Sequence, residues 1–474
     1  MIGDLKPYSA YKESGLPWLG KVPVDWPVLP NRAVFGEVKD RNHPDEEMLS
    51  VTITKGVIKQ NSLLSGTSKK DSSNLDRSAY KLVQPRDIAY NKMRAWQGAI
   101  GAAALRGIIS PAYVVMRLRD DDNMPLYFHH LYRTPQFAKE AERWSYGITS
   151  DMWSLRPEHF KMIYTPVPHP SEQAAIVRFL DWANGRLERT IVAKRKVIAL
   201  LTEQKQAIIH RAVTRGLDPS VPLKASDNPW LGDIPQSWEV LQVRRVVSFV
   251  TSGSRSWANH YSDDGLIFLQ SGNLGRSMSL NLSYIQHVRP PDGAEGKRTR
   301  VQLNDVLVCV TGALTGNVAE VDQELPAPAF VNQHVALVRP KRDMIQPRFL
   351  AYVLHSEVGR TQFKASEYGG TKQGLGLGDV KCVFVPVPSL DEQRTVCNFL
   401  DDELARFKNA ISRLEREIEL LREYRTRLVA DVVTGKLDVR KAAARLPEES
   451  TPAAADELGD WSDEIEPADE EAAV

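Results

Sequence analysis

The sequence predicts a mixed α+β protein in which two globular domains are each followed by a long helix, as an internal duplication. Three observations support this prediction. The segment Pro17–Pro23, followed by Trp26, recurs 212 residues later as Pro229–Pro235, followed by Trp238. Short β-like runs separated by Gly, Asn and Ser turns follow each of these segments. A helical pattern with a seven-residue hydrophobic repeat then closes each copy.

A second set of landmarks repeats in the same order, 220 residues apart. Its members are Pro166-Val167-Pro168, Glu172-Gln173 and Phe179-Leu180-Asp181, matched by Pro386-Val387-Pro388, Glu392-Gln393 and Phe399-Leu400-Asp401. A repeat of about 200 residues is a domain with an appendage, because solenoid repeats run ~20–50 residues. Two related units can sit about a pseudo-two-fold axis, which suits a partner with two related halves such as duplex DNA.

Each copy divides into a globular part and a helical part. We expect β-strands at Ala112–Leu118, Val306–Val310 and Val335–Val338, and helical stretches near Leu126–Ala141 and Pro347–Lys364. The resulting segments are a first globular domain at 1–165, a central helical spacer at 166–226, a second globular domain at 227–385, a distal helical spacer at 386–440 and an acidic disordered tail at 441–474.

The two long helices carry an apolar stripe. Ser171 and Asp391 stand where helix N-caps belong, and Gly216 and Gly435 stand where the helices stop. Because an apolar stripe is unstable in water, we expect the two helices to form an antiparallel coiled coil, although such a seam is also a common oligomerisation device. The residues expected to pack the helices together are Leu187, Ile191, Ile198, Leu201, Ile208, Leu404, Phe407, Ile411, Leu414, Ile418, Leu421 and Leu428.

The net charge is distributed unevenly between the C-terminal residues and the rest of the chain. The net charge is +1, but residues 447–474 hold eleven acidic side chains and no Lys or Arg, so the remainder carries +12. A basic body with an acidic tail fits a polyanionic partner, although an excess of this size favours nucleic acid only weakly. No apolar run reaches ~18 residues and the N-terminus lacks an apolar signal region, so we expect a cytoplasmic protein without a membrane span.

Catalytic and metal-binding signatures are absent from the sequence. Cys309, Cys382 and Cys397 lack Cys-x-x-Cys spacing, so neither a zinc site nor a disulfide framework is predicted. The P-loop, H-E-x-x-H, G-x-S-x-G and kinase motifs are also missing. We therefore expect a non-catalytic chain without a metal or cofactor of its own.

Polar and aromatic loops are the better functional signal. Asn and Gln can read adenine bidentately and Arg or Lys can read guanine in the major groove. An ordinary polar loop around one packed Trp is the alternative for each segment. The candidate DNA-binding residues are Asn91, Lys92, Arg94, Trp96, Gln97, Arg143, Tyr146, Thr149 and Ser150 in the first copy, and Ser254, Arg255, Trp257, Asn273, Arg276, Asn332, Gln333, His334, Tyr368, Thr371, Lys372 and Gln373 in the second.

The repeated landmarks resemble those of a known family. Trp18-Leu19-Gly20 with Pro23 and Trp26, the Pro-Val-Pro and Glu-Gln pairs, and the helix ends Ala212–Asp218 and Val432–Asp438 occur in order. Over residues 11–440 the chain is similar to the specificity (S) subunit of type I restriction–modification systems. The resemblance implies that each globular part is a target-recognition domain and that the helices form an antiparallel coiled coil.

The resemblance also implies a function. Each recognition domain would read one half of a bipartite, asymmetric DNA site, and the coiled coil would set the spacer between the halves. Two modification subunits carrying S-adenosylmethionine would methylate adenine N6 after flipping the base out of the stack. Restriction subunits would add cleavage driven by ATP and Mg. The acidic tail departs from the family pattern.

Two other functions remain open at this stage. A coiled-coil scaffold with two protein-binding domains would share the duplication and the helices. A fused nuclease or methyltransferase is disfavoured by the missing motifs. DNA binding that weakens steeply with salt would distinguish the specificity subunit from the scaffold, because phosphate contacts release counterions.

Overall fold

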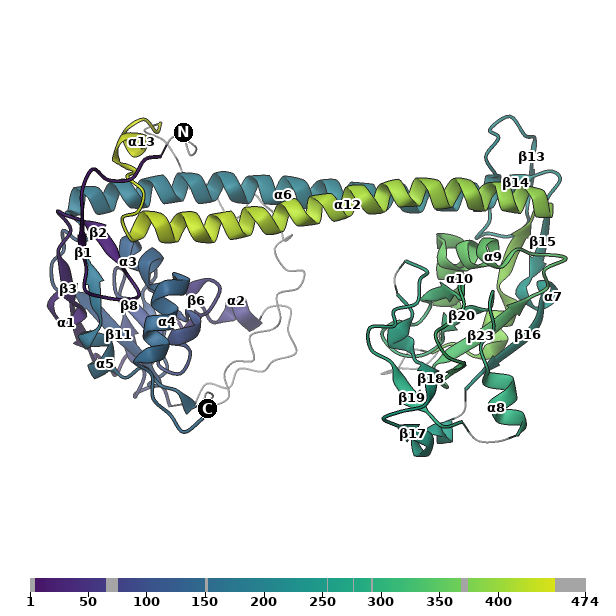
Figure 1. The fold of residues 1–474 in the computed structure, drawn as a ribbon, viewed down its shortest axis with the longest axis horizontal. Coiled ribbons are helices and arrows are strands. Elements are labelled where there is room, and N and C mark those ends of the chain that lie inside the picture. Colours follow the sequence, from purple (N-terminus) through teal and green to yellow (C-terminus); the bar gives the residue numbers. More distant parts are fainter. Residues whose placement is uncertain are drawn as a thin grey trace. The chain divides into compact units, whose positions relative to one another are not determined.

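The computed structural model describes residues 5–64, 76–149, 152–253, 255–275, 277–290, 293–367 and 374–447 (Figure 1). The chain forms two compact units. The first unit comprises Met1–Arg195 and Glu415–Val474, and the second comprises Lys196–Leu414. Each unit combines one globular domain with part of both long helices, α6 (Pro170–Arg215) and α12 (Leu390–Val433).

A four-stranded antiparallel sheet forms the centre of the first unit. Its order is β4 (Phe35–Val38), β11 (Tyr113–Leu118), β8 (Ile88–Asn91) and β9 (Ile100–Ala102). Side chains alternate between its faces, so Tyr90 enters one core and Ala89 enters another. Both faces are therefore covered, which explains the nearly continuous apolar sequence of the two central strands.

Short elements surround this sheet. The helices α3 (Pro125–Tyr132) and α4 (Pro135–Arg143) replace the single helical stretch predicted at Leu126–Ala141, because Thr134 and Pro135 start a new helix and Thr134 Oγ1 accepts the Phe137 N–H at 3.2 Å. The remaining elements are β1 (Tyr11–Glu13), β2 (Lys21–Pro23), β3 (Val28–Pro30), α1 (Asn31–Val34), β5 (Leu49–Thr52), β6 (Gly56–Lys59), α2 (Asn61–Leu64), β7 (Lys81–Val83), η2 (Ala95–Gln97), β10 (Gly107–Ile109), α5 (Pro157–Met162) and β12 (Tyr164–Pro166).

The second unit repeats the same sheet. Its order is β16 (Val247–Ser252), β23 (Val335–Pro340), β20 (Val306–Cys309) and β21 (Val318–Glu320), again antiparallel throughout. The helical stretch predicted at Pro347–Lys364 divides at Ser356 into α9 (Pro347–His355) and α10 (Glu357–Ser366). The predicted strands of both units are present, with bounds shifted by one or two residues.

The second unit also has a sheet that the first unit lacks among the described residues. Its order is β17 (Tyr261–Ser262), β19 (Gln286–Val288), β18 (Leu266–Leu269) and β22 (Ala329–Val331), and β18 pairs with β22 in parallel. The other elements of this unit are β13 (Leu223–Ala225), β14 (Asp233–Pro235), β15 (Glu239–Gln242), α7 (Val243–Val246), η4 (Arg255–His260), η5 (Ser271–Asn273), α8 (Ala294–Thr299), α11 (Leu377–Cys382) and β24 (Phe384–Val387).

Matching polar contacts show that the duplication extends to individual side chains. Arg117 donates two hydrogen bonds to Asp87, at 2.7 and 2.8 Å, and Arg339 donates two to Asp305, both at 2.8 Å. Each pair joins the second and third strands of its sheet, and both aspartates are buried. A fully hydrogen-bonded pair of this kind offsets the cost of burying the carboxylate.

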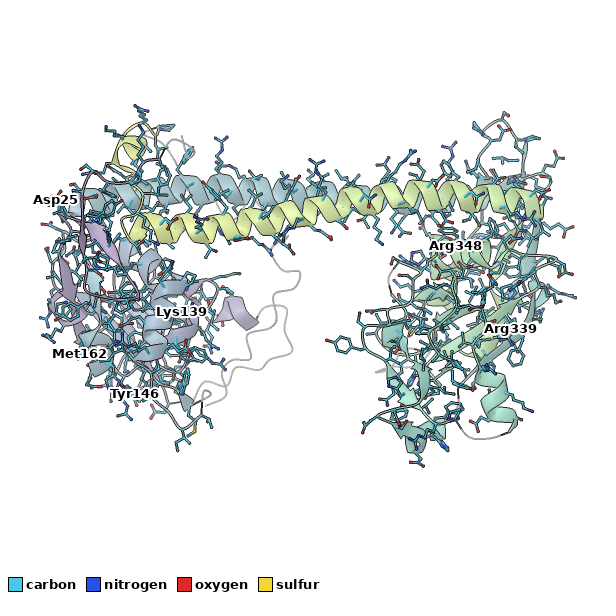
Figure 2. All side chains as sticks on the ribbon, in the orientation of Figure 1. Asp25, Lys139, Tyr146, Met162, Arg339 and Arg348 are labelled. Atoms are coloured by element: carbon cyan, nitrogen blue, oxygen red, sulfur yellow. The ribbon has the colours of Figure 1, made fainter. Side chains whose placement is uncertain are left out.

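The Glu-Gln landmark joins each long helix to its globular domain. Gln173 Nε2 donates to Pro168 O at 2.8 Å, and its Oε1 accepts the Met124 N–H at 2.8 Å. Gln393 repeats this arrangement with Pro388 O at 2.9 Å and the Gln346 N–H at 2.7 Å. In the second unit Arg348 of α9 also donates to Asp401 of α12 at 2.7 Å (Figure 2).

The long helices pair in an antiparallel sense. In the first unit Glu188 of α6 lies 2.9 Å from Arg425 of α12, and Lys194 of α6 lies 2.6 Å from Glu417 of α12. Residue numbers therefore increase along α6 while those of its neighbours in α12 decrease, as expected for antiparallel helices (Figure 1). In the second unit Ile208 and Leu404 pack on one shared core. The residues predicted to lie on the seam are all buried or half-buried, namely Leu187, Ile191, Ile198, Leu201, Ile208, Leu404, Phe407, Ile411, Leu414, Ile418, Leu421 and Leu428.

The helices begin earlier than the predicted caps. The helix α6 starts at Pro170 and α12 at Leu390, so Ser171 and Asp391 lie inside the first turn. The cap of α12 is Ser389, whose Oγ accepts the Glu392 N–H at 3.3 Å. The predicted caps are therefore wrong by two residues in the second helix, because Ser389 is as good a cap as Asp391.

The acidic tail starts later than predicted. A short helix, α13 (Arg440–Ala444), lies where the tail was expected to begin at 441, and Ala442, Ala443 and Leu446 are buried. Arg178 of α6 donates to the carbonyl of Leu446 at 2.9 Å. The folded part of the first unit therefore extends to 447, and the residues beyond it lie outside the described ranges. Within the described ranges no helix is long and apolar enough to cross a membrane.

Candidate nucleic-acid interface

The first candidate loop, at Asn91–Gln97, is a hydrogen-bonded turn between β8 and β9. Asn91 Oδ1 accepts the Met93 N–H at 2.9 Å, and Trp96 Nε1 donates to Met93 O at 2.9 Å. Arg94 donates to Gln97 Oε1 at 3.0 Å. These bonds hold the polar side chains in one conformation, which lowers the entropy cost of binding a partner.

The structure brings the second candidate segment beside the first. The Leu155 N–H donates to Lys92 O at 2.9 Å, and the rings of Trp96 and Trp153 meet edge to face with centroids 5.5 Å apart. Tyr146 and Ser154 exchange two backbone hydrogen bonds, at 3.4 and 3.1 Å. We call residues 145–154 the Tyr146 hairpin; its Ser150 and Asp151 lie outside the described residues.

The side chains of this surface combine positive charge with apolar area. Lys92 and Arg94 are half-buried, and Arg143 is exposed beside Glu140, with 3.6 Å between the charged groups. Tyr146 is 59% exposed (Figure 2) and Ile148 is 90% exposed. The sequence prediction named the polar residues and Tyr146 but missed Ile148 and Met152, because exposure of an apolar side chain cannot be read from residue type.

Arg133, which follows α3 directly, bonds the end of the same loop. Its guanidinium donates to the carbonyls of Gly98 and Ile100 at 3.0 Å each, to Ile53 at 2.7 Å and also to Thr54. Burial lowers the pKa of Arg133 to about 10. The prediction from sequence missed this residue, since a single Arg at the end of an apolar helix gives no sign that it will bind five backbone carbonyls.

In the second unit the candidate segments meet at one edge of the sheets. The Gly253 N–H donates to Asn332 O at 3.0 Å, and the Val310 N–H donates to His334 O at 2.9 Å. The Asn332 N–H donates to Leu269 O at 3.0 Å, just before Gln270. Strand ends far apart in sequence therefore lie together at one polar edge. Their proximity could not be predicted from the sequence.

Several candidate residues of this edge have buried side chains that are engaged within the protein. Trp257 is 1% exposed, stacks on Phe268 and donates to Glu295 at 2.9 Å. Asn273 donates to the carbonyls of residues 281 and 284, at 2.9 Å each, and its Oδ1 accepts the Gln270 N–H at 2.8 Å. Asn332 is buried, and its Oδ1 accepts the His334 N–H at 2.9 Å.

Asn91 in the first unit has the same structural role. It is buried, and its side chain closes the turn after β8. Asn side chains commonly replace a backbone acceptor in such turns, so their presence after a strand is not specific for base recognition. The contact of Asn91 with a base therefore stays a prediction, and in this conformation its side chain oxygen is engaged by the Met93 N–H.

The other candidates of the second unit lie at the surface edge or outside the described residues. Gln333 Nε2 lies 2.9 Å from His334 Nε2, and His334 Nδ1 is hydrogen-bonded to Thr311. The candidates whose placement or side chain the described ranges do not include are Ser254, Arg255, Arg276, Tyr368, Thr371, Lys372 and Gln373. Within those ranges no three His, Cys, Asp or Glu side chains gather into a metal site.

Comparison with known proteins gives consistent matches. A family model described as "Type I restriction modification DNA specificity domain" matches residues 292–421. The chain is 21% identical over 375 residues to the type I restriction enzyme MjaVIII specificity subunit of Methanocaldococcus jannaschii, covering 77% of this chain and 83% of that protein. It is 24% identical over 237 residues to the EcoBI specificity subunit of Escherichia coli, covering 49% of each.

A solved structure shares the fold. It is described as "Structural basis underlying complex assembly and conformational transition of the type I R-M system", with a TM-score of 0.66 and 16% identity. The match covers 88% of this chain and 99% of that chain. At this identity the similarity establishes the fold, while the functional residues come from the geometry above.

Proposed function

We propose that the chain is the DNA sequence-recognition subunit of a type I restriction–modification complex, because it is similar to the specificity subunits of such systems. Each globular domain reads one half of a bipartite DNA site. The observation that carries this proposal is that two domains with the same sheet order present different candidate surfaces. A shared framework with different loops is the arrangement expected for reading two different half-sites.

The half-sites are asymmetric in this proposal. The first unit offers the Tyr146 hairpin beside the loop at Asn91–Gln97. The second unit offers the edge near His334, and its extra sheet β17–β19–β18–β22 reshapes the surroundings of that edge. Different side chains on different scaffolds favour different base pairs, because base edges in the major groove present distinct donor and acceptor patterns.

The helices α6 and α12 set the spacer between the half-sites. They contain 46 and 44 residues and pair antiparallel within each unit. At ~1.5 Å per residue a helix of this size is about 65–70 Å long. A coiled coil of this length is stiff enough to fix a distance, and its heptad seam allows that distance to change in whole repeats.

The partners of the proposed function supply the chemistry. Double-stranded DNA binds this chain, two modification subunits bind S-adenosylmethionine and methylate adenine N6, and restriction subunits use ATP and Mg for cleavage. This chain takes no catalytic step and binds no cofactor. The positive charge outside the tail, +12, favours association with DNA phosphates.

A genome-wide map of adenine methylation tests the proposal. Cells expressing this chain with its neighbouring modification subunit are compared with cells lacking the chain. We expect a new bipartite motif with a fixed spacer. The absence of new methylation, with the modification subunit active beside another specificity subunit, would reject DNA recognition.

The salt dependence of DNA affinity distinguishes the proposed function from a scaffold with two protein-binding domains. A specificity subunit should lose DNA affinity by about 10³–10⁵ between 50 and 200 mM salt if it contacts 6–10 phosphates. A scaffold that does not bind DNA shows no such dependence.

A further inference from the structure

Two strands of the central sheet in the first unit end beside one another. The strands β4 and β8 flank β11 and run antiparallel to it, so both end at the edge of the sheet where β11 begins. Lys39 directly follows β4, and Lys92 directly follows β8. Because neighbouring strands lie about 4.8 Å apart, the backbones of these two lysines are about 10 Å from each other.

The residues that follow β4 also run beside the start of β7. The Leu82 N–H donates to Asp40 O at 2.8 Å, and the Asn42 N–H donates to Ser78 O at 3.1 Å. Arg41 lies between these two bonded positions and is exposed. The edge of the sheet therefore gathers basic residues from the ends of β4 and β8 and from the start of β7.

Lys81, the first residue of β7, is a buried cation at this edge. The residue is 8% exposed, and its ammonium donates to the carbonyl of Pro111 at 3.0 Å and to that of Tyr113. It forms no ion pair within the part of the chain that the structure describes. An ammonium has three N–H donors, so these two bonds leave one for a ligand. A buried charge without a counter-ion is costly, which favours an anion beside it.

Two further cations stand close to Lys81. Burial, followed by the charges of Lys92 and Arg41, lowers the pKa of Lys81 to about 8. Among the described residues the side chains of Arg41 and Lys92 have no hydrogen-bonded or ionic partner. Their donors are therefore available to the same anion.

The acids nearest in sequence to this edge are engaged by other side chains. Glu37 of β4 lies 3.3 Å from Lys39 and 2.8 Å from Lys161. Asp40 is hydrogen-bonded to His43 at 2.9 Å. These carboxylates therefore do not neutralise the three cations around the start of β7.

We propose that Arg41, Lys81 and Lys92, which we call the cationic edge, bind phosphates of the DNA backbone beside the half-site of the first unit. Lys92 also belongs to the candidate loop at Asn91–Gln97, so the cationic edge adjoins a surface proposed to read bases. Phosphates flank the base edges of a duplex, and contacts with them fix the register of a protein on DNA. This inference rests on the proposed function and assigns its phosphate contacts in the first unit.

The salt dependence of DNA affinity tests the cationic edge. The full-length chain in complex with its modification subunits is titrated with a duplex of the mapped motif at salt concentrations between about 50 and 200 mM. Each phosphate contact contributes about 0.9 to the slope of log affinity against log salt. We expect the double variant Arg41→Gln and Lys92→Gln to lose about 1.8 of this slope, which makes its loss over the range about tenfold smaller than that of the wild type.

The effect should be independent of DNA sequence. A phosphate carries no sequence information, so the double variant should weaken on matched and unrelated duplexes alike and keep the same methylation motif. The matched control is Lys12→Gln with Arg445→Gln, which removes two exposed charges from other elements of the first unit and should keep the wild-type slope. Unchanged melting temperatures verify that both variants fold.

Neutral methylphosphonate linkages locate the contact on the DNA. Duplexes of the mapped motif each carry one such linkage in place of a phosphate. The wild type should bind more weakly when the linkage stands at one or two positions beside one half-site. The double variant should be insensitive at those positions, because the cations that contact them are absent.

Three results would overturn the inference while the proposed function stands. One is a wild-type salt slope in the double variant. Another is a changed methylation motif, which would make the cationic edge a contact with bases. The third is a wild type that inorganic phosphate stabilises against heat while the slopes stay equal, which would make it a site for free anions. Failure of the proposed function looks different, since no bipartite methylation motif would appear at all.

Discussion

Asparagine side chains in this protein bind the backbone of their own turns. Asn91, Asn273 and Asn332 each follow a strand or a short turn, where base-reading amides would also be expected. Each is buried, and each accepts a backbone N–H within three residues. A carboxamide that is already engaged cannot pair with adenine without leaving backbone groups unsatisfied, at a cost of about 1–3 kcal/mol each.

We expect buried His355 to make the stability of the second unit pH-dependent. Burial, followed by the charges of Arg360 and Lys205, lowers the pKa of His355 to about 3. Arg360 donates to its Nε2 at 3.4 Å, which requires the neutral ring. The unfolded chain, with a pKa of about 6.5, then binds more protons than the folded one below that pH, so the unfolding free energy falls by about 1.4 kcal/mol per pH unit.

We expect the His355→Gln variant to lose this dependence. Urea denaturation of wild type and variant at pH 7 and pH 5 measures it. The wild type should lose about 2 kcal/mol more than the variant across this range, since the effect begins near pH 6.5. Equal losses would show that His355 is not kept neutral by its surroundings.

At the scale of elements, the Glu-Gln landmark is a joint between helix and domain. The landmark was recognised from sequence as a repeated motif, but only the structure shows what it does. Gln173 and Gln393 are fully buried, and each bonds the chain before its helix and a backbone N–H of its domain. The same joint in both units gives each globular domain a fixed orientation on its own helix.

Shortening the helices by one heptad tests whether they set the spacer. Within the second unit, residues 198–204 of α6 and 408–414 of α12 can be removed together, which keeps the seven-residue register. One heptad is ~10 Å of helix, or about three base pairs. Methylation mapping should give the same half-sites with a shorter spacer.

The control for this deletion is removal of seven residues from α6 alone. It should abolish methylation, because the apolar stripes no longer match. An unchanged spacer after the paired deletion would reject the role of the helices as a ruler.

At the scale of the whole molecule, charge is distributed unevenly along the chain. Residues 448–474 contain eleven acids and no Lys or Arg, while the rest carries +12. Opposite charges on one chain weaken its field at long range, and salt screens that field beyond about 8–10 Å. If the proposed function holds, we expect the charge of the tail to reduce attraction to DNA mainly at low ionic strength.

Truncation after Pro447 should speed association with DNA by about tenfold at low salt and have little effect at high salt. Stopped-flow binding at two ionic strengths measures this. A tail of the same length with Asn and Gln in place of its acids should behave like the truncation. Rates equal to the wild type in both variants would show that the tail does not influence DNA binding.

Most of the fold could be predicted from the hydrophobic periodicity and the repeated motifs of the sequence. The duplication, the mixed α+β class and the two long helices are confirmed, because apolar spacing and repeated landmarks are local properties of the chain. The sequence did not predict the helix breaks at Thr134 and Ser356 or the N-cap at Ser389. Neighbouring residues were equally good positions for a helix to begin.

The exposure of the candidate residues could not be predicted, because it depends on contacts between segments that are distant in sequence. Burial of Trp257 and Asn273, the carbonyl contacts of Arg133 and the exposure of Ile148 all follow from what the folded chain places around each residue. Residue type indicates which groups a side chain can bind, whereas tertiary packing decides whether those groups face solvent or the backbone. The resemblance to a family, the two-domain plan and the candidate segments could therefore be inferred from the sequence, but the exposure and hydrogen-bond partners of each candidate side chain had to be taken from the packed structure.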